Sequence, residues 1–377
     1  MLLPVQVLGR RYVAYSGSEE ARLKAAVCPA LGSDERELLQ YLNCLPLHRF
    51  FAMLRVEQEL SMAMVFASVF GLSVWLMAAS VQADCKPSKW GAGDELGAGN
   101  TITPARVLAA SKLIKRGQVR HLGIVVDRTT PAYAPRSLSL TIVQPNQAWN
   151  APLPKNGLVY NDDIFTGWFG IGSQIDGLAH IGHGDGHGAE FYNCFQGKDI
   201  SQTTGMTKLG IDKIPPIAAR GVLIDMATHL KVKHLDAGQA FGVAEVEAAA
   251  QQQRVSIKPG DVVLFHTGWT DAKLQSDPQA WGSAEPGLAP EVATWLASKG
   301  VLAVGADTWG VDVIPPLKEG EPFPGHMTLL KDHGIYILEV MDTGPLAREH
   351  IHEFFFVLGP SRIRGAVQAI VDPIAIY

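Results

Sequence analysis

Three side chains in one short stretch could bind a metal ion: Gln174, Asp176 and His180. Gln174 and Asp176 are two residues apart, so an extended chain turns both to the same side. Asp176 and His180 are four residues apart and share a face if the chain becomes helical after Asp176. An amide, a carboxylate and an imidazole that converge in this way suit Zn²⁺ or Mn²⁺. The same spacing occurs in solvated turns without a metal, so on its own it leaves both interpretations open.

Further candidate residues surround this stretch. His183 and His187 follow it, and each could supply an additional metal ligand or line the entrance of the site. Asp307 and Asp312 follow a short apolar stretch, where loops of α/β folds often carry function, although helix capping or ion pairing would also explain them. Four aromatic side chains could wall a pocket for an aromatic or cyclic substrate, or could pack in the core: Trp168, Phe169, Tyr192 and Trp309.

The elements that would position these residues alternate between strand and helix patterns. Short apolar runs predict strands at 221–226, 262–266, 301–304 and 335–341, and helical patterns cover 243–253 and 289–300. Thr103 and Pro104 are typical of a helix start, which predicts a helix over 105–115. Residues 137–143 alternate apolar and polar side chains, which predicts a half-buried strand. Strands that alternate with single helices indicate an α/β architecture.

The late strand carries one unexpected side chain. With a period of two residues, Glu339 lies on the same face as Ile335 and Ile337. A charged group on an otherwise apolar face is costly unless it is paired or bound to a metal.

These motifs resemble those of a known family. The sequence GSQIDGLAHIG at 172–182 is similar to the HxGTHxDxPxH signature of the cyclase family, which includes kynurenine formamidase and isatin hydrolase. The resemblance extends from Lys89 to the C-terminus and is typical of the long branch of the family. Its other matches are WGAGDELG at 90–97, FYN at 191–193, RGVLID at 220–225, TGW at 267–269 and GADT at 305–308.

The resemblance implies a swivelling β/β/α domain, with a mixed sheet and flanking helices, that binds one or two divalent metals. Asp176 matches the aspartate that can bridge two metals, and His180 matches the catalytic acid/base. His326 and Glu339 match the histidine and glutamate of the second metal.

Two departures from the signature bear on the metal count. Its first histidine falls at Gly170 and its second at Gln174. We therefore expect one metal held by Asp176, His326 and Glu339, with Gln174 as an optional fourth ligand.

The activity implied by the resemblance is metal-dependent hydrolysis of an amide, a cyclic amide or imide, or a lactone, through a metal-activated water. The substrate would be a small cyclic or aromatic molecule, and His180 and Glu339 would move protons. Two alternatives remain open, a catalytically inactive metal- or ligand-binding protein and a metal-dependent lyase or dehydratase. The family resemblance also favours a homo-oligomer, with a homodimer as the simplest form.

Composition and the N-terminal region indicate the class of protein and its location in the cell. The apolar fraction of 47% and net charge of −5 indicate a globular protein without a nucleic-acid partner. An uncharged apolar run at 62–79 followed by small residues is typical of a secretory signal. It predicts a lead over 1–83, cleavage after Ala83, a single hydrolase domain over 84–377, and a periplasmic or secreted location. An uncleaved membrane anchor and a soluble, cytoplasmic helix are the alternatives. Cys85 and Cys194 would remain after cleavage, either paired or free.

Overall fold

The computed structural model describes residues 3–7, 10–14, 85–147 and 155–377. The chain divides into two compact units, Met1–Gln82 and Ala83–Tyr377. In the first unit, β1 (Leu3–Val7) pairs antiparallel with β2 (Arg10–Ala14). The apolar run at 62–79 and the predicted cleavage after Ala83 lie outside the described residues and stay predictions. Among the residues that are described, no helix has the length and apolar character needed to cross a bilayer.

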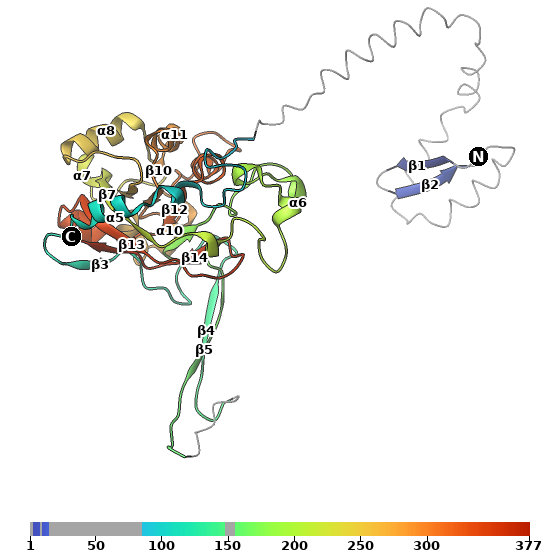
Figure 1. Ribbon diagram of the computed structural model, residues 1–377, viewed down its shortest axis with the longest axis horizontal. Coiled ribbons are helices and arrows are strands. Elements are labelled where there is room, and N and C mark those ends of the chain that lie inside the picture. The colour runs from blue at the N-terminus through green and yellow to red at the C-terminus, as the bar shows by residue number, and fades with distance from the viewer. Residues whose placement is uncertain (1–2, 8–9, 15–84, 148–154) are drawn as a thin grey trace, which may run out of the picture. The chain divides into compact units, whose positions relative to one another are not determined.

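A nine-stranded mixed sheet forms the centre of the second unit, in the order β14-β6-β12-β11-β9-β7-β13-β15-β3 (Figure 1). The four middle strands β12, β11, β9 and β7 are parallel, and the outer pairs are antiparallel. The strands of this sheet are β3 (Val119–His121), β6 (Gln174–Asp176), β7 (Ile217–Asp225), β9 (Val262–His266), β11 (Ala303–Ala306), β12 (Tyr336–Glu339), β13 (Glu353–Leu358), β14 (Gln368–Ile370) and β15 (Ile374–Ile376). Because parallel strands end at the same edge of a sheet, residues at the ends of β9, β11 and β12 lie close together.

Helices and short turns connect the strands. In Figure 1, α7, α8 and α11 gather on one side of the sheet. The helices are α5 (Pro104–Ser111), α6 (Gly197–Ile200), α7 (Met226–His229), α8 (Val243–Gln252), α9 (Trp269–Lys273), α10 (Pro278–Ser283), α11 (Pro290–Lys299), α12 (Pro324–His326), its π-helical continuation η7 (Met327–Asp332) and α13 (Gly344–Arg348). Single 3₁₀ turns are η3 (Gly97–Thr101), η4 (Gly186–Gly188), η5 (Tyr192–Cys194) and η6 (Ile211–Lys213), and β8 (Ala240–Phe241) pairs with β10 (Gly287–Leu288).

Local sequence signals account for several boundaries. The predicted helix and strand at 243–253 and 262–266 are confirmed by α8 and β9. α11 begins at Pro290 and ends at Lys299, and the positive φ of 71° at the following residue, Gly300, suits a glycine. In α5 the Thr103 side chain accepts from the Arg106 amide as expected, but the helix ends at Ser111 rather than at residue 115. The strand expected at 301–304 begins two residues later, as β11.

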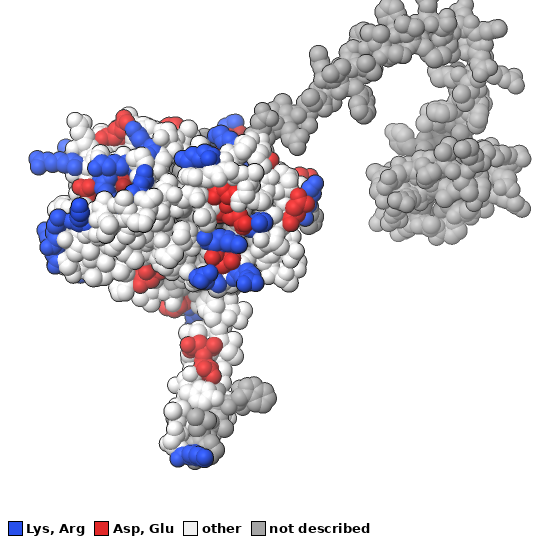
Figure 2. Space-filling model, in the orientation of Figure 1, with Lys and Arg blue, Asp and Glu red and all other residues white. Residues whose placement is uncertain are grey.

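The core lies along the middle strands. Val262, Val263, Leu264 and Phe265 of β9 are all fully buried. Continuous apolar strands of this kind are required where both faces of a parallel sheet are covered. The α/β class expected from the sequence, with a mixed sheet and flanking helices, is therefore confirmed. On the face shown in Figure 2, basic and acidic side chains are interspersed, in agreement with the small net charge.

One pair of strands stands apart from the sheet. β4 (Leu138–Val143) pairs antiparallel with β5 (Asp162–Gly167), and together they form an arm that projects from the domain (Figure 1). The strand that the sequence predicted here is present. The prediction that it is half-buried is wrong, because four of the six residues of β4 are exposed. Alternating side chains predict a two-faced ribbon, and the ribbon pairs with no strand outside the arm among the described residues.

The start of the second unit is fastened to the domain by a disulfide. Cys85 bonds to Cys194, with their Cα atoms 5.5 Å apart, so the pairing that the sequence left open is present. Next to it, the buried Tyr192 donates its hydroxyl to the Asp94 carboxylate. Tyr192 was a candidate pocket residue, but these contacts make it part of the core beneath the N-terminal segment.

Candidate metal centre

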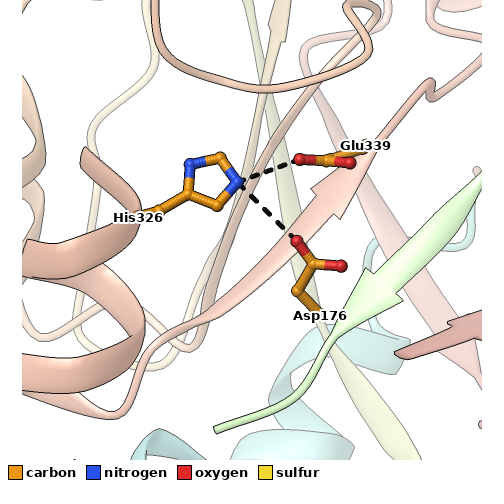
Figure 3. A group of neighbouring side chains, drawn as sticks. All are labelled: Asp176, His326 and Glu339. Carbon is orange, nitrogen blue, oxygen red and sulfur yellow. Dashed lines mark hydrogen bonds and ion pairs between the residues drawn. The ribbon is translucent and has the colours of Figure 1, made fainter. Parts of the chain in front are cut away.

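Three of the predicted ligands meet at one point (Figure 3). One possible ligand atom from each of Asp176, His326 and Glu339 lies within 4.8 Å of the others. Asp176 lies on β6 and Glu339 ends the neighbouring strand β12, where the antiparallel register sets Ile337 opposite Asp176. His326 enters from the helical segment α12. Asp176 and Glu339, 163 positions apart in the chain, thus converge because β6 and β12 are adjacent strands.

The cluster is buried, and one of its oxygens accepts no hydrogen bond. The exposed fractions of Asp176, His326 and Glu339 are 0%, 4% and 4%. His326 Nε2 lies 3.0 Å from Glu339 Oε1 and 3.7 Å from Asp176 Oδ2. Asp176 Oδ2 is buried and accepts no hydrogen bond. Buried polar atoms are nearly always satisfied, so a buried carboxylate oxygen without a donor, beside a second carboxylate and an imidazole, fits a site for a divalent cation.

Asp312 fixes the orientation of His326. Its Oδ2 lies 2.7 Å from His326 Nδ1, and its carboxylate also accepts from the backbone amides of Gly325 and His326 at 2.6 Å and 3.1 Å. A carboxylate partner on one ring nitrogen sets the tautomer that leaves the other nitrogen free to bind a metal. Asp312 thus accepts from the amides at the start of α12 and pairs with His326, and a role for it in the site stays a prediction.

Two glutamines bridge the carboxylates. Gln174 donates from Nε2 to Glu339 Oε2 at 2.5 Å and to Asp176 Oδ1 at 3.3 Å. Gln368 on β14 donates to the same Asp176 oxygen at 2.8 Å. Gln174 thus presents its amide nitrogen to the cluster, whereas the optional ligand role expected for it requires the oxygen. No local sequence signal pointed to Gln368, because its place is set by the pairing of β14 with β6.

An arginine occupies the place of the missing signature histidine. A Cβ atom built on Gly170 would lie about 2.4 Å from Arg136 Nη1 and 3.0 Å from Gln368 Oε1. Arg136 Nη1 donates to the Gly170 carbonyl at 2.9 Å. A guanidinium therefore fills the space into which a side chain at position 170 would project. The sequence analysis did not single out Arg136, because no motif in the residues around it indicates a role in the site.

The pKa values of the titratable groups in the site differ from their usual values. Burial raises the pKa of Glu339 to about 7, and the nearby charge of Asp176 adds to this. Burial alone would lower the pKa of His326, but its hydrogen bonds with Asp312 and Glu339 hold that pKa well above the usual value. Burial lowers the pKa of His180 below its usual value, so this imidazole is neutral near pH 7. Perturbed groups of this kind are typical of functional sites.

His180 reaches the site from a turn rather than from a helix. After Asp176 the chain makes a turn in which the His180 amide donates to the Gly177 carbonyl at 3.0 Å. The side chain is half-buried, and the charges of Asp176, His326 and Arg136 all act on the pKa of its imidazole. The conditional helix after Asp176 is not formed, and His180 lies in a turn instead.

An aromatic wall stands next to His326. Phe323 packs edge-on to the His326 ring with centroids 5.3 Å apart, and Trp309 lies edge-on to Phe323 at 6.1 Å. Tyr133 stacks on Trp309 at 5.5 Å. Trp309 was a candidate pocket residue, whereas the sequence analysis did not single out Tyr133 or Phe323.

The other candidate pocket residues lie outside the three-residue cluster. Asp307 is buried and accepts from the Thr267 and Gly268 amides, so it holds the turn after β9. His183 is exposed, and its backbone pairs with Glu190. Trp168 and Phe169 line a groove at the base of the arm. The side chain of His187 is outside the described part of the chain.

The fold and the cluster define a class of protein, an α/β domain with a buried carboxylate–imidazole cluster, a candidate metal site, at adjoining strands of a mixed sheet. The model of the family described as "Putative cyclase" matches residues 120–313, and the chain belongs to this family. A comparison with curated proteins found no match.

Solved structures share the fold. A crystal structure described as a novel cyclase is 29% identical over 77% of this chain and 96% of its own, with a TM-score of 0.69. Isatin hydrolase A from Ralstonia solanacearum is 20% identical over 73% of this chain and 97% of its own, with a TM-score of 0.52. An isatin hydrolase bound to the product analogue thioisatinate is 16% identical over 73% of this chain and 99% of its own, with a TM-score of 0.51. The isatin hydrolases show a common fold, and the novel cyclase is similar in sequence as well.

Proposed function

We propose that the protein is a metal-dependent hydrolase that cleaves an amide, a cyclic amide or imide, or a lactone bond of a small cyclic or aromatic molecule. The observation that carries the proposal is the unpartnered Asp176 Oδ2, buried beside His326 Nε2 and Glu339. Two carboxylates and one imidazole suit Zn²⁺ or Mn²⁺, and three protein ligands leave positions for water and substrate.

A divalent cation held by Asp176, His326 and Glu339 would lower the pKa of a coordinated water and polarise the scissile carbonyl. His180 can take up a proton, because burial keeps its imidazole neutral near pH 7. It can then return that proton to the leaving nitrogen or oxygen. Glu339, with its pKa of about 7, is a second group that can accept a proton at this pH.

Arg136 gives the site a positive charge that the motif resemblance did not reveal. Its side chain is half-buried, and its positive charge acts on both His180 and Glu339. We assign it the stabilisation of negative charge on the substrate carbonyl oxygen, as fixed donors do in other acyl-transfer sites.

The substrate class is argued from the aromatic side chains next to His326. Tyr133, Trp309 and Phe323 form an aromatic surface that ends at His326. Flat aromatic rings stack on such a surface, which supports a cyclic or aromatic substrate. The structures of isatin hydrolases with the same fold make a ring-opening hydrolysis the first reaction to test.

We also propose that the domain acts in an exported, oxidising space. The Cys85–Cys194 disulfide supports this location, because disulfides persist in such compartments and are rare in the cytosol.

The test combines metal analysis with substrate screening. Purified full-length protein should contain about one Zn or Mn per chain and hydrolyse isatin-like rings, N-formyl aromatic amines or aromatic lactones. His180→Ala should abolish turnover and keep the metal content, whereas His183→Ala, an exposed control, should keep both. Bound metal without turnover would favour a binding protein. A product without oxygen from labelled water would favour a lyase.

A further inference from the structure

A cavity lies between the start of the second unit, at residues 86–90, and the end of α11. Its volume is about 170 Å³. The apolar part of its lining includes the buried side chains of Ala98, Val301 and Ile335 and the half-buried Trp90. A cavity of about 150 Å³ with apolar walls holds one benzene ring. The space and its lining therefore suit a ligand with a single aromatic ring.

Basic side chains complete the lining of this cavity. Lys86 Nζ lies 3.4 Å from His333 Nε2, and Lys89 Nζ lies 4.4 Å from the centroid of the Trp90 ring. Burial and the positive charges of the two lysines lower the pKa of His333, so its imidazole is neutral near pH 7. Neither lysine forms an ion pair within residues 85–147 and 155–377. Two cationic groups beside a cavity, without a counter-charge, attract an anion.

The acidic residue of the lining does not supply that counter-charge. Asp332 Oδ1 lies 3.4 Å from Nζ of Lys331, a buried lysine whose Nζ also lies 3.0 Å from Glu190 Oε1. Asp332 thus pairs with a cation inside the domain. An anionic ligand would supply the counter-charge that Lys86 and Lys89 lack.

The cavity is separate from the metal cluster, although one segment of the chain reaches both. From His326 the segment continues through η7 to Asp332 and His333 at the cavity, and β12 then leads back to Glu339. None of the three cluster residues lines the cavity. Ile335, which does, precedes Glu339 by four residues, or about 13 Å at roughly 3.3 Å per residue of extended chain. A ligand of one ring in the cavity therefore does not reach the metal cluster.

We propose that this cavity is a second binding site, which takes a small aromatic carboxylate. The ring packs on Trp90, Val301 and Ile335, and the carboxylate accepts hydrogen bonds from the ammonium groups of Lys86 and Lys89. Such charge-assisted hydrogen bonds are stronger than those between neutral groups. Hydrolysis of a cyclic amide or lactone fused to an aromatic ring would release a ligand of this class. The site itself rests on the cavity and its charges and does not depend on that reaction.

Saturation-transfer NMR on the full chain, with benzoate as the probe, tests the site. Benzoate should bind with a Kd of about 0.1–1 mM, a range that suits a ligand of this size. Lys86→Ala with Lys89→Ala removes both charges and should weaken binding at least about tenfold. Lys112→Ala with Lys115→Ala removes two exposed charges from the turn after α5. This matched control should bind benzoate as the natural protein does.

A second variant and two further probes test the apolar half of the site. Ala297→Phe, at a half-buried position of α11, fills the cavity and should also weaken benzoate binding at least about tenfold, while thermal unfolding checks the fold. Benzamide has the ring without the charge, and inorganic phosphate has charge without the ring. Both should bind at least about tenfold more weakly than benzoate.

Excess chelator separates this site from the metal centre. Benzoate affinity should be the same with and without chelator, and because no turnover is measured, the result is independent of the proposed hydrolysis. Binding that disappears with chelator would place benzoate at the metal and overturn the proposal. So would an absence of binding, equal affinities in the two double-lysine variants, or benzamide or phosphate binding as tightly as benzoate.

Discussion

The imidazole of His326 is held at Nδ1 by Asp312 Oδ2, 2.7 Å away, and its Nε2 therefore faces Asp176 and Glu339. This hydrogen bond decides whether the third ligand presents a lone pair to the cluster. Asp312 also accepts from two backbone amides, so the same carboxylate fixes both the ring and the turn that carries it.

Asp312→Asn should weaken metal binding by about 10–100-fold without unfolding the protein. An Asn oxygen in the Oδ1 position can still accept from the Gly325 amide, but an amide nitrogen in the Oδ2 position would donate to His326 Nδ1 and could not accept from the His326 amide. The ring proton would then stand on Nε2, the nitrogen that must bind the metal. Calorimetric titration with Zn²⁺ measures the change, and far-ultraviolet circular dichroism checks the fold. An unchanged affinity would show that Asp312 only shapes the turn.

Metal affinity should rise with pH. In the metal-free protein the pKa of His326 is held well above its usual value and that of Glu339 is about 7, so near pH 6 both groups carry protons. A cation must displace these protons, and each one displaced makes the affinity rise about tenfold per pH unit. Titrations between about pH 6 and 8, in buffers of different ionisation enthalpy, count the protons released. An affinity that is flat over this range would contradict the assigned ligands.

Arg136 and Gly170 offer a test of the metal count. Gly170→His with Arg136→Ala replaces the guanidinium by an imidazole at the position of the signature histidine. The double variant should bind a second metal, whereas Arg136→Ala alone should stay near one per chain. The single variant should also lose about 10²–10³-fold in kcat, as on removal of one oxyanion donor. Elemental analysis gives the stoichiometry. One metal in the double variant, together with full activity in Arg136→Ala, would refute both roles.

Much of the site followed from the sequence because its residues break local rules. Glu339 stood out as a charge on an apolar strand, and Asp176 had a histidine four residues away. The family resemblance then joined these to His326. In the structure, ligand atoms of Asp176, His326 and Glu339 lie within 4.8 Å of one another. Their roles as ligands stay a prediction, since geometry alone does not bind a metal.

The residues that the sequence missed are placed by long-range pairing. Gln368 reaches Asp176 because β14 pairs with β6, across 192 positions of the chain. Arg136 reaches Gly170 from the base of an arm that no local pattern predicts. The strand expected at 137–143 was wrong on burial, because periodicity identifies the two faces of a strand but not what covers each face.

The buried carboxyl of Glu285 gives a prediction about the pH dependence of stability. Its side chain is fully buried, Oε1 has no hydrogen-bond partner, and Oε2 accepts from the Gly310 amide at 3.2 Å. Burial raises its pKa well above 4.5, and the charges of Glu339 and Asp312 raise it further. In the unfolded chain this carboxyl ionises near 4.5, whereas in the folded protein it keeps its proton to higher pH.

The sign of the resulting pH dependence is fixed. A raised pKa in the folded state contributes stability that is present below the unfolded pKa and is lost as pH rises towards the folded pKa. Glutamine does not titrate. The free energy of unfolding of Glu285→Gln, minus that of the natural protein, should therefore grow by about 1.4 kcal/mol per pH unit between the unfolded and the folded pKa of Glu285. Urea unfolding at about pH 5 and pH 8, with chelator present throughout, measures it. Glu247→Gln, an exposed change on α8, is the control and should show no such growth. If the difference in unfolding free energy between Glu285→Gln and the natural protein is the same at both pH values, the Glu285 carboxyl is already ionised in the folded protein.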